Sequence, residues 1–217
     1  MPAKNALPAK QPHLKAQNAL CLQNNPDNQF ALKMMFPTVG GLSQDVVLVT
    51  LLQRILDDGI CTRFPANIRE KYGLVYDISC DSQFFCDMGT FSIDATVSEE
   101  RADELLEKLK IEFAHILNKP PSKNELDHIK YRYLFDLKQI QETPSRFLNR
   151  EVTRHFMESS FSIEDEMRAI EFAKEDDILF TAQKIFAGPR RAFVFVGPKA
   201  RKKRALVEKF LTVFDTL

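Results

Sequence analysis

The sequence has no long apolar run, no excess charge of either sign and no tryptophan. No run approaches the ~18 consecutive apolar residues of a membrane-spanning helix, and residues 1–17 lack the apolar stretch of a secretory signal. Thirty basic residues balance thirty acidic ones, so no global field attracts nucleic acid or an anionic membrane. We therefore predict a soluble chain with no membrane insertion and no nucleic-acid partner, and its compartment stays open.

Cysteine is also scarce. The four cysteines, Cys21, Cys61, Cys80 and Cys86, fit neither a zinc ribbon nor a Cys-x-x-Cys redox pair, so we interpret them as buried or half-buried thiols. Cys80 and Cys86 flank a predicted hairpin, and the even count leaves their redox state open.

Motifs for metal binding and nucleophilic catalysis are missing as well. The sequence contains no Gly-x-Ser-x-Gly elbow and no phosphate-binding loop. Glu125 and His128 fall on adjacent turns of one predicted helix, but no second histidine follows at i+4 to complete a helical zinc site. We interpret His115, His128 and His155 as surface or capping residues, and we expect no metal in this chain.

What the chain does contain is enough apolar sequence for a core. Of its 217 residues, 44% are hydrophobic, and its eighteen phenylalanines are interpreted mainly as core filling. Residues 1–17 hold three prolines and no periodicity, which indicates an irregular arm or linker. We expect residues 18–217 to form a single domain.

Apolar periodicity predicts the elements of that domain. Alternation or continuous apolar sequence predicts strands at 19–23, 30–36, 74–78, 91–97 and 192–196, the last of them buried on both faces. Helical spacing and capping signals predict helices at 42–56, from Ser98 to Pro120, and at 123–141, 144–157, 162–170, 175–186 and 204–214. Because helices do not alternate regularly with strands, we predict an α+β fold, a mostly antiparallel sheet backed by helices on one face.

The most informative stretch runs from Ile60 to Ser79. It contains a short helix-compatible segment, a turn at Gly73 and a β-type run, so Arg69 precedes the turn and Tyr76 follows it. Such a turn brings a guanidinium and a phenol toward one carbonyl oxygen, where they bind or polarise a peptide bond. Without a nucleophile, base or metal, this pair cannot hydrolyse the bond alone. Taken without further context, the two residues are more simply interpreted as an ordinary ion pair and a packed ring.

A resemblance to a known family favours the first interpretation. Thr62-Arg63-Phe64 followed by Ile68-Arg69-Glu70-Lys71-Tyr72-Gly73-Leu74-Val75-Tyr76 resembles the signature of the non-catalytic halves of the pitrilysin, insulinase and mitochondrial-processing-peptidase family of zinc metallopeptidases. The resemblance covers most of the chain, from about Asn18 to the last helix. It implies the metallohydrolase domain fold of that family, in which two such domains close over an unfolded peptide.

In that family one domain holds zinc through His-x-x-Glu-His and a downstream glutamate, and the other contributes an arginine and a tyrosine. The zinc-binding string is missing here, so the resemblance implies the non-zinc half, inactive alone, with zinc in a homologous partner domain or subunit. Arg69 and Tyr76 are then the contacts to the carbonyl and oxyanion. The side chains expected to line the peptide-binding wall near this motif are Arg63, Phe64, Phe84 and Phe85.

Two functions remain open at this point. The first is the substrate-binding half of a zinc metalloendopeptidase, which clamps an unfolded peptide against the partner's zinc site. The alternative is a catalytically silent scaffold or assembly subunit, like the core subunits of the respiratory complex that share this fold. In either case we expect the surface that would face a zinc half to support pairing or self-association.

Overall fold

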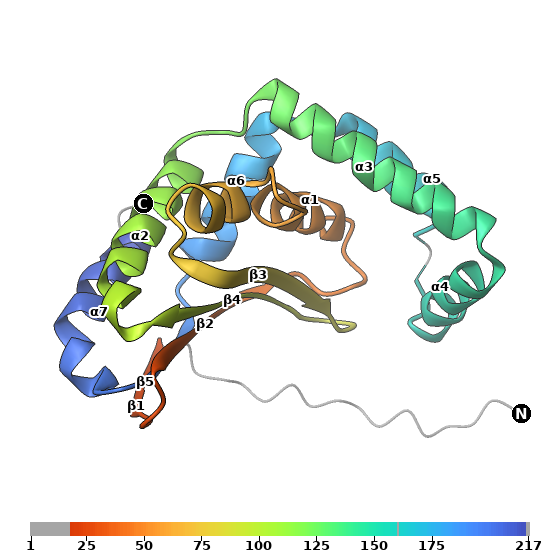
Figure 1. Ribbon diagram of the computed structural model, residues 1–217. Helices are drawn as coiled ribbons and strands as arrows, with labels where there is room; N and C mark the ends of the chain where they lie inside the picture. The colour runs from red at the N-terminus through yellow and green to blue at the C-terminus, as the bar shows by residue number, and fades with distance from the viewer. Residues whose placement is uncertain (1–17, 160, 216–217) are drawn as a thin grey trace, which may run out of the picture.

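The sheet is the frame on which the rest of the chain is arranged (Figure 1). The computed structural model describes residues 18–159 and 161–215, so the predicted arm at 1–17 lies outside the described residues. The strands are β1 (Ala19–Asn24), β2 (Gln29–Thr38), β3 (Val75–Phe84), β4 (Gly89–Ser98) and β5 (Ala192–Gly197). They follow the order β1-β5-β2-β4-β3. The β1–β5 pair is parallel and the other three pairs are antiparallel. The predicted α+β fold with a mostly antiparallel sheet is confirmed.

The helices lie on one face of this sheet and extend beyond it. They are α1 (Val46–Leu56), α2 (Ala102–Asn118), α3 (Lys123–Glu142), α4 (Pro144–Phe156), α5 (Ile163–Phe172), α6 (Glu175–Phe186) and α7 (Arg204–Leu211). Shorter helical turns are the π-helix Pro65–Glu70 and the 3-10 segments Glu99–Arg101, Ala200–Lys203 and Thr212–Asp215. Figure 1 shows α1, α2, α6 and α7 against the sheet, whereas α3 and α5 run side by side as an arm that carries α4 at its far end.

Alternation along the strands places one face of the sheet in the core. In β2 the side chains of Phe30, Leu32, Met34 and Phe36 are buried, while the residues between them are exposed. The inward side chains pack largely ring against ring. Phe113 of α2 lies at the centre of this packing, with ring centroids 5.3 Å from Phe186 and 4.8 Å from Phe214. The phenylalanine-rich core is therefore confirmed at these positions.

The capping signal predicted for α3 is present in the structure, whereas the one predicted for α2 is not. At the start of α3, Glu125 N–H donates to Ser122 Oγ (3.2 Å) and Ser122 N–H donates to Glu125 Oε2 (3.3 Å), which is the predicted capping box. Ser98 precedes the Glu99–Arg101 turn that leads into α2, but its side chain makes no capping bond. No helix among the described residues is long and apolar enough to cross a membrane.

The predictions for β5 and for the start of α1 are wrong in detail. In β5 only every second residue is buried, because the face of the sheet away from the helices has no helical cover. The helix predicted from residue 42 begins at Val46, since residues 41–45 form turns that start with a Ser43 N–H to Gly40 O bond (3.0 Å).

The cysteine prediction is wrong for three residues. Cys21, Cys61 and Cys86 are exposed, because they lie on the edge strand β1, in the turn before the π-helix and in the β3–β4 hairpin loop. Cys80 of β3 is buried, and burial raises the pKa of its thiol well above the ordinary value. All four thiols are free.

Candidate functional site

The stretch that carries the motif begins with a tightly bonded turn. Gly59 adopts a positive φ of 107°, and Thr62 Oγ1 donates to Gly59 O (2.6 Å) and accepts from Asp58 N–H (3.0 Å). These bonds end α1 and redirect the chain into the π-helix Pro65–Glu70, whose Ile68 is fully buried. The helical segment that carries Arg69 is therefore fixed by the core on one side and by this turn at its start.

Gly73 reverses the chain between Arg69 and Tyr76. Its φ of 57° is a left-handed conformation that glycine adopts without steric cost. Gly73 N–H donates to Arg69 O (2.8 Å), and Leu74 N–H donates to Ile68 O (3.2 Å). The predicted turn is thus present and joins the π-helix directly to β3.

Tyr76 stands at an irregularity of β3 that turns its ring outward. Val75 pairs with Val97 and Asp77 pairs with Thr96, so Tyr76 is the extra residue of a bulge in the β3–β4 ladder. Its side chain is 93% exposed, and its phenol makes no hydrogen bond to any described residue. A phenol in this position is free to donate to a ligand.

Arg69 is held more loosely than a structural arginine. Its Nε donates to Glu70 Oε1 (3.0 Å), and 34% of its side chain is exposed. The structure shows no bond between Arg69 and Tyr76 within the described residues. The two side chains are thus brought to the same turn, and their convergence on one carbonyl oxygen stays a prediction.

A hollow of about 600 Å³ adjoins Tyr76. Arg101, at the end of the turn before α2, lies in it and donates to Gly73 O (2.5 Å) and Tyr72 O (2.8 Å). Arg101 therefore clamps the turn that separates Arg69 from Tyr76. Sequence reasoning missed this residue, because no short motif links it to a turn twenty-eight positions away.

Side chains at the C-terminal end of α1 hydrogen-bond the main chain of β3, the edge strand of the sheet near the motif. Cys80 N–H donates to Asp57 Oδ2 (2.8 Å), and Gln53 Nε2 donates to Cys80 O (3.1 Å). Both outward main-chain groups of Cys80 are therefore bonded, which protects an edge strand from pairing with another chain. Burial is the main cause that raises the pKa of Asp57, and the Cys80 bond opposes it.

Arg63 and Phe64, two of the four residues predicted for a peptide-binding wall, belong to the interior of the domain. Arg63 forms a two-bond ion pair with Glu125 (2.7 and 2.9 Å), and only 10% of its side chain is exposed. Phe64 is fully buried, with its ring 5.8 Å from that of Phe113. These positions connect the π-helix to α2 and α3, so they offer little surface to a peptide.

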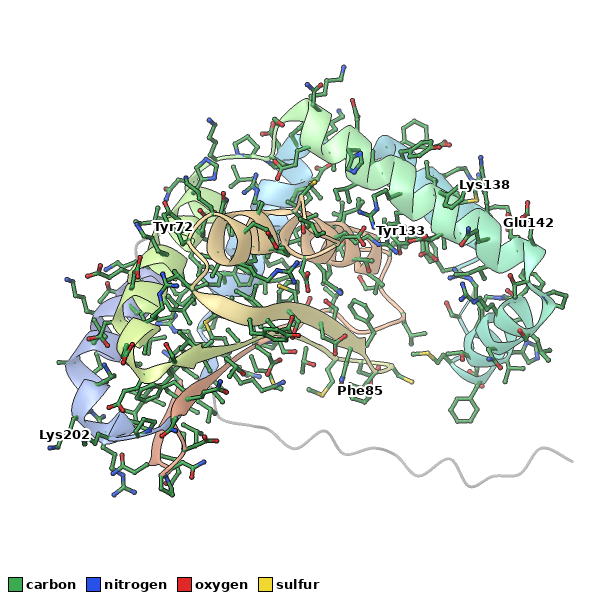
Figure 2. All side chains as sticks on the ribbon, in the orientation of Figure 1. Tyr72, Phe85, Tyr133, Lys138, Glu142 and Lys202 are labelled. Atoms are coloured by element: carbon green, nitrogen blue, oxygen red, sulfur yellow. The ribbon has the colours of Figure 1, made fainter. Side chains whose placement is uncertain are left out.

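Phe84 and Phe85, the other two predicted wall residues, lie far from the motif. Phe84 is the last residue of β3 and Phe85 follows it, whereas Tyr76 lies near the start of the strand, eight residues or roughly 26 Å from Phe84. Figure 2 places Phe85 at the hairpin end, on the opposite side of the molecule from Tyr72. Phe85 is 56% exposed. The expectation that this pair adjoins the motif was wrong, because β3 continues six residues beyond its predicted end.

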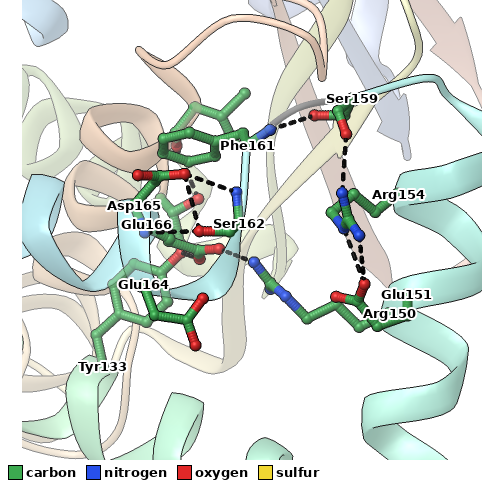
Figure 3. A network of polar contacts seen from close by, with 12 residues as sticks. Tyr133, Arg150, Glu151, Arg154, Ser159, Phe161, Ser162, Glu164, Asp165 and Glu166 are labelled. Atoms are coloured by element: carbon green, nitrogen blue, oxygen red, sulfur yellow. Dashed lines mark hydrogen bonds and ion pairs between the residues drawn. The ribbon is translucent and has the colours of Figure 1, made fainter.

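A second cavity, of about 500 Å³, lies beneath α4 and is lined in part by Phe84. A buried polar network borders it (Figure 3). Tyr133 Oη donates to Glu166 Oε1 (2.5 Å), and Arg150 donates to the other oxygen of the same carboxylate. Burial, followed by the charge of Glu166, raises the pKa of Tyr133, so its phenol stays a donor. The three residues come from α3, α4 and α5, and no spacing in the sequence links them.

The three histidines considered as metal ligands lie on the surface, as predicted. His115, His128 and His155 are exposed. Within residues 18–159 and 161–215, no group of three or more His, Cys, Asp or Glu side chains is arranged to hold a metal ion. The residues that the structure describes therefore do not fit a zinc site.

Comparison of the sequence with protein families and curated proteins gives consistent matches. A family described as "Peptidase M16 inactive domain" matches residues 2–133. A protein from Rickettsia felis named "Uncharacterized zinc protease" is 29% identical over 150 residues, which cover 68% of this chain and 36% of that protein. A protein of the same name from Rickettsia bellii is 27% identical over the same shares. The chain thus spans about a third of the length of these relatives.

Comparison of the fold with solved structures extends the likeness. A peptidase M16 inactive domain from Pseudomonas fluorescens superposes with a TM-score of 0.77 and 22% identity, covering 84% of this chain and 44% of that one. A protease from Helicobacter pylori gives 0.76 and 16%, with 83% and 44% covered. A chain of complex III from Candida albicans gives 0.68 and 14%, with 88% and 49% covered. At these identities the likeness concerns the fold.

Proposed function

Because the chain belongs to the peptidase M16 inactive-domain family, we propose that it is the substrate-binding, zinc-lacking half of a zinc metalloendopeptidase. In this proposal residues 18–217 act as one domain that clamps an unfolded peptide against a zinc site in a homologous domain or subunit. The names of the Rickettsia relatives support the assignment, and their greater length leaves room for such a partner domain.

The availability of Tyr76 carries the proposal. A phenol that is 93% exposed on a bulge, with no bond to a described residue, donates without first giving up an internal partner. Among the described residues, the Arg69 side chain hydrogen-bonds the exposed Glu70, and such surface pairs contribute little to stability. We assign both to the carbonyl oxygen of the scissile peptide bond, where donors that strengthen as charge develops lower the barrier.

The remaining parts of the site have supporting roles. Arg101 holds the Tyr72–Gly73 carbonyls and so positions the turn between the two donors. Arg63 and Phe64 contribute to the stability of the domain and do not contact the peptide in this proposal. Among the predicted wall residues, Phe84 and Phe85 remain candidates for contact with a distant part of a long peptide, because one lines a cavity and the other is exposed.

A scaffold or assembly subunit without activity remains the second candidate, and the likeness of the fold to a complex III chain favours it. The two functions are separated by mixing the purified chain with a protein that carries His-x-x-Glu-His and is encoded in the same or an adjacent reading frame. The peptidase proposal predicts that an unstructured peptide is cleaved only when both are present. A stable complex that cleaves no peptide supports the scaffold.

A further inference from the structure

The cavity of about 500 Å³ beneath α4 has two walls of different chemistry. The body of the domain contributes apolar side chains to it, among them Val46, Phe84 and Phe161. The side chains that α4 contributes are all polar: Asn149, Arg150, Thr153 and Arg154. Cavities of this size hold small organic molecules. A ligand that matches both walls has an apolar body and a polar end.

The polar end of the cavity is built from buried groups. Tyr133 and Glu166 line the cavity and are only 6% and 9% exposed. Figure 3 shows Arg150 reaching from α4 to the Glu166 carboxylate, whose other oxygen accepts from Tyr133 Oη. Each oxygen of Glu166 thus already has a donor. The group with unused hydrogen-bonding capacity at this point is Arg150.

Arg150 has more donors than the structure uses. A guanidinium carries five N–H groups. The one hydrogen bond that Arg150 makes to a described residue runs from Nη2 to Glu166, and its Nε is buried without a partner among those residues. A buried donor left without an acceptor destabilises the folded protein. A ligand acceptor that draws this edge of the guanidinium toward the cavity removes that cost.

The other guanidinium in the lining is already occupied. Arg154 donates through Nε and Nη2 to Glu151 (2.9 and 2.6 Å) and through Nη1 to Ser159 O (3.3 Å). A cationic ligand would meet both guanidinium groups and a Glu166 carboxylate that is already bonded, so the lining favours an anion. The adjacent Nε and Nη groups of an arginine match the two oxygens of a carboxylate.

We propose that this cavity binds an organic carboxylate with an apolar body. The carboxylate accepts from Arg150, and the apolar body packs against Val46, Phe84 and Phe161. Two sources share this chemistry, a free medium-chain acid and the C-terminal residue of a peptide that ends in an apolar side chain. The binding does not depend on the proposed peptidase function, because none of the residues 69–76, all of them described, lines the cavity.

Isothermal titration calorimetry of the whole chain with hexanoate and with N-acetylphenylalanine tests the proposal. At least one of these acids is expected to bind with a dissociation constant of about 0.1–5 mM, the range for so small a ligand. Hexanol and N-acetylphenylalanine amide, which lack the charge, should bind more weakly by a factor on the order of ten. Tighter binding of hexanoate identifies a free acid as the source, and tighter binding of N-acetylphenylalanine identifies a peptide terminus.

Two substitutions test the position of the ligand. Arg150→Lys keeps the charge but loses the fork, so it should weaken binding by a factor on the order of ten. Asn149→Trp places an indole in the cavity from an exposed position and leaves the Arg150–Glu166 bond in place, so it should also weaken binding. Arg146→Lys is the matched control, because Arg146 lies on the same helix, is exposed and does not line this cavity.

The wild type and Arg146→Lys should bind alike, with melting temperatures and circular dichroism spectra that agree for these two and for Asn149→Trp. The proposal is overturned if neither acid binds at about 5 mM, or if the neutral analogues bind as tightly as the acids. It is also overturned if Asn149→Trp, folded as the wild type is, binds the acid with unchanged affinity.

Discussion

Asp57 accepts a hydrogen bond from the main-chain N–H of Cys80 (2.8 Å), and this contact closes the edge of the sheet beside the proposed peptide site. The carboxylate is partly desolvated there, which raises its pKa. The bond and the desolvation act in opposite directions on stability, so the two contributions are separable by substitution.

Asp57→Asn is expected to keep the bond and remove the cost of burying a charge. A folded-state pKa above the unfolded value means that the contribution of Asp57 to stability is fully present below about pH 4 and is lost as the pH rises through the raised pKa. The free energy of unfolding of Asp57→Asn, taken relative to that of the wild type, should therefore increase as the pH rises from 3.5 to 7.5. Urea unfolding across this range measures it.

The control for that series is Asp57→Ala, which removes the acceptor. It leaves the Cys80 N–H without its partner and should cost about 1–3 kcal/mol at pH 7. If Asp57→Asn loses as much stability as Asp57→Ala at pH 7, the bond requires the charge and the interpretation is wrong.

Tyr133→Phe is expected to destabilise the α3–α4–α5 arm. It removes the donor to Glu166, a residue only 9% exposed, and should cost about 1–3 kcal/mol in the free energy of unfolding. Tyr131→Phe on the same helix is the matched control, because Tyr131 is 69% exposed. Equal denaturation midpoints for the two variants would contradict a structural role for the buried network.

Phe64→Ala is expected to lower the free energy of unfolding. A fully buried phenylalanine replaced by alanine costs about 3–5 kcal/mol, whereas Phe85→Ala at a half-exposed position should stay within about 0.5 kcal/mol. Chemical denaturation of the two variants measures the difference. A Phe64→Ala protein of wild-type stability would place this ring outside the core and return it to the peptide-binding wall.

Arg101→Ala is expected to loosen the turn that carries the site. Loss of its bonds to Tyr72 O and Gly73 O should speed hydrogen exchange at the Gly73 and Leu74 amides, since local opening becomes easier. Exchange in α6 and β2 should stay unchanged. Arg204→Ala, which removes an exposed pair with Glu208, is the control and should leave the turn protected.

The elements that the sequence predicted well are those with local signals. The alternation from Phe30 to Phe36 and the Ser122–Glu125 capping box depend on neighbours in the chain, and both were found as predicted. The turn at Gly73 belongs to the same class, because a left-handed residue after a helical segment is a local requirement.

The failures concern placement in three dimensions. Phe64 next to Arg63 resembled a site residue, and only the packing of the π-helix on α2 shows that it is buried. The helix at 144–157 was predicted, but which side of α4 faces the body depends on Arg150 meeting Glu166. Contacts between residues so far apart leave no periodic trace in a single sequence.

The proposed donors Arg69 and Tyr76 are tested most directly by turnover of a complex reconstituted with the zinc-bearing half. If both hydrogen-bond the scissile carbonyl, Tyr76→Phe and Arg69→Lys should each lower kcat by ~10²-fold, with KM and melting temperature nearly unchanged. Arg69→Lys keeps the charge but loses the planar fork, so it should fall well short of wild type. Arg204→Lys should retain full activity. Wild-type kcat in both site variants, or losses that match a loss of folded protein, would contradict the assignment and favour the scaffold.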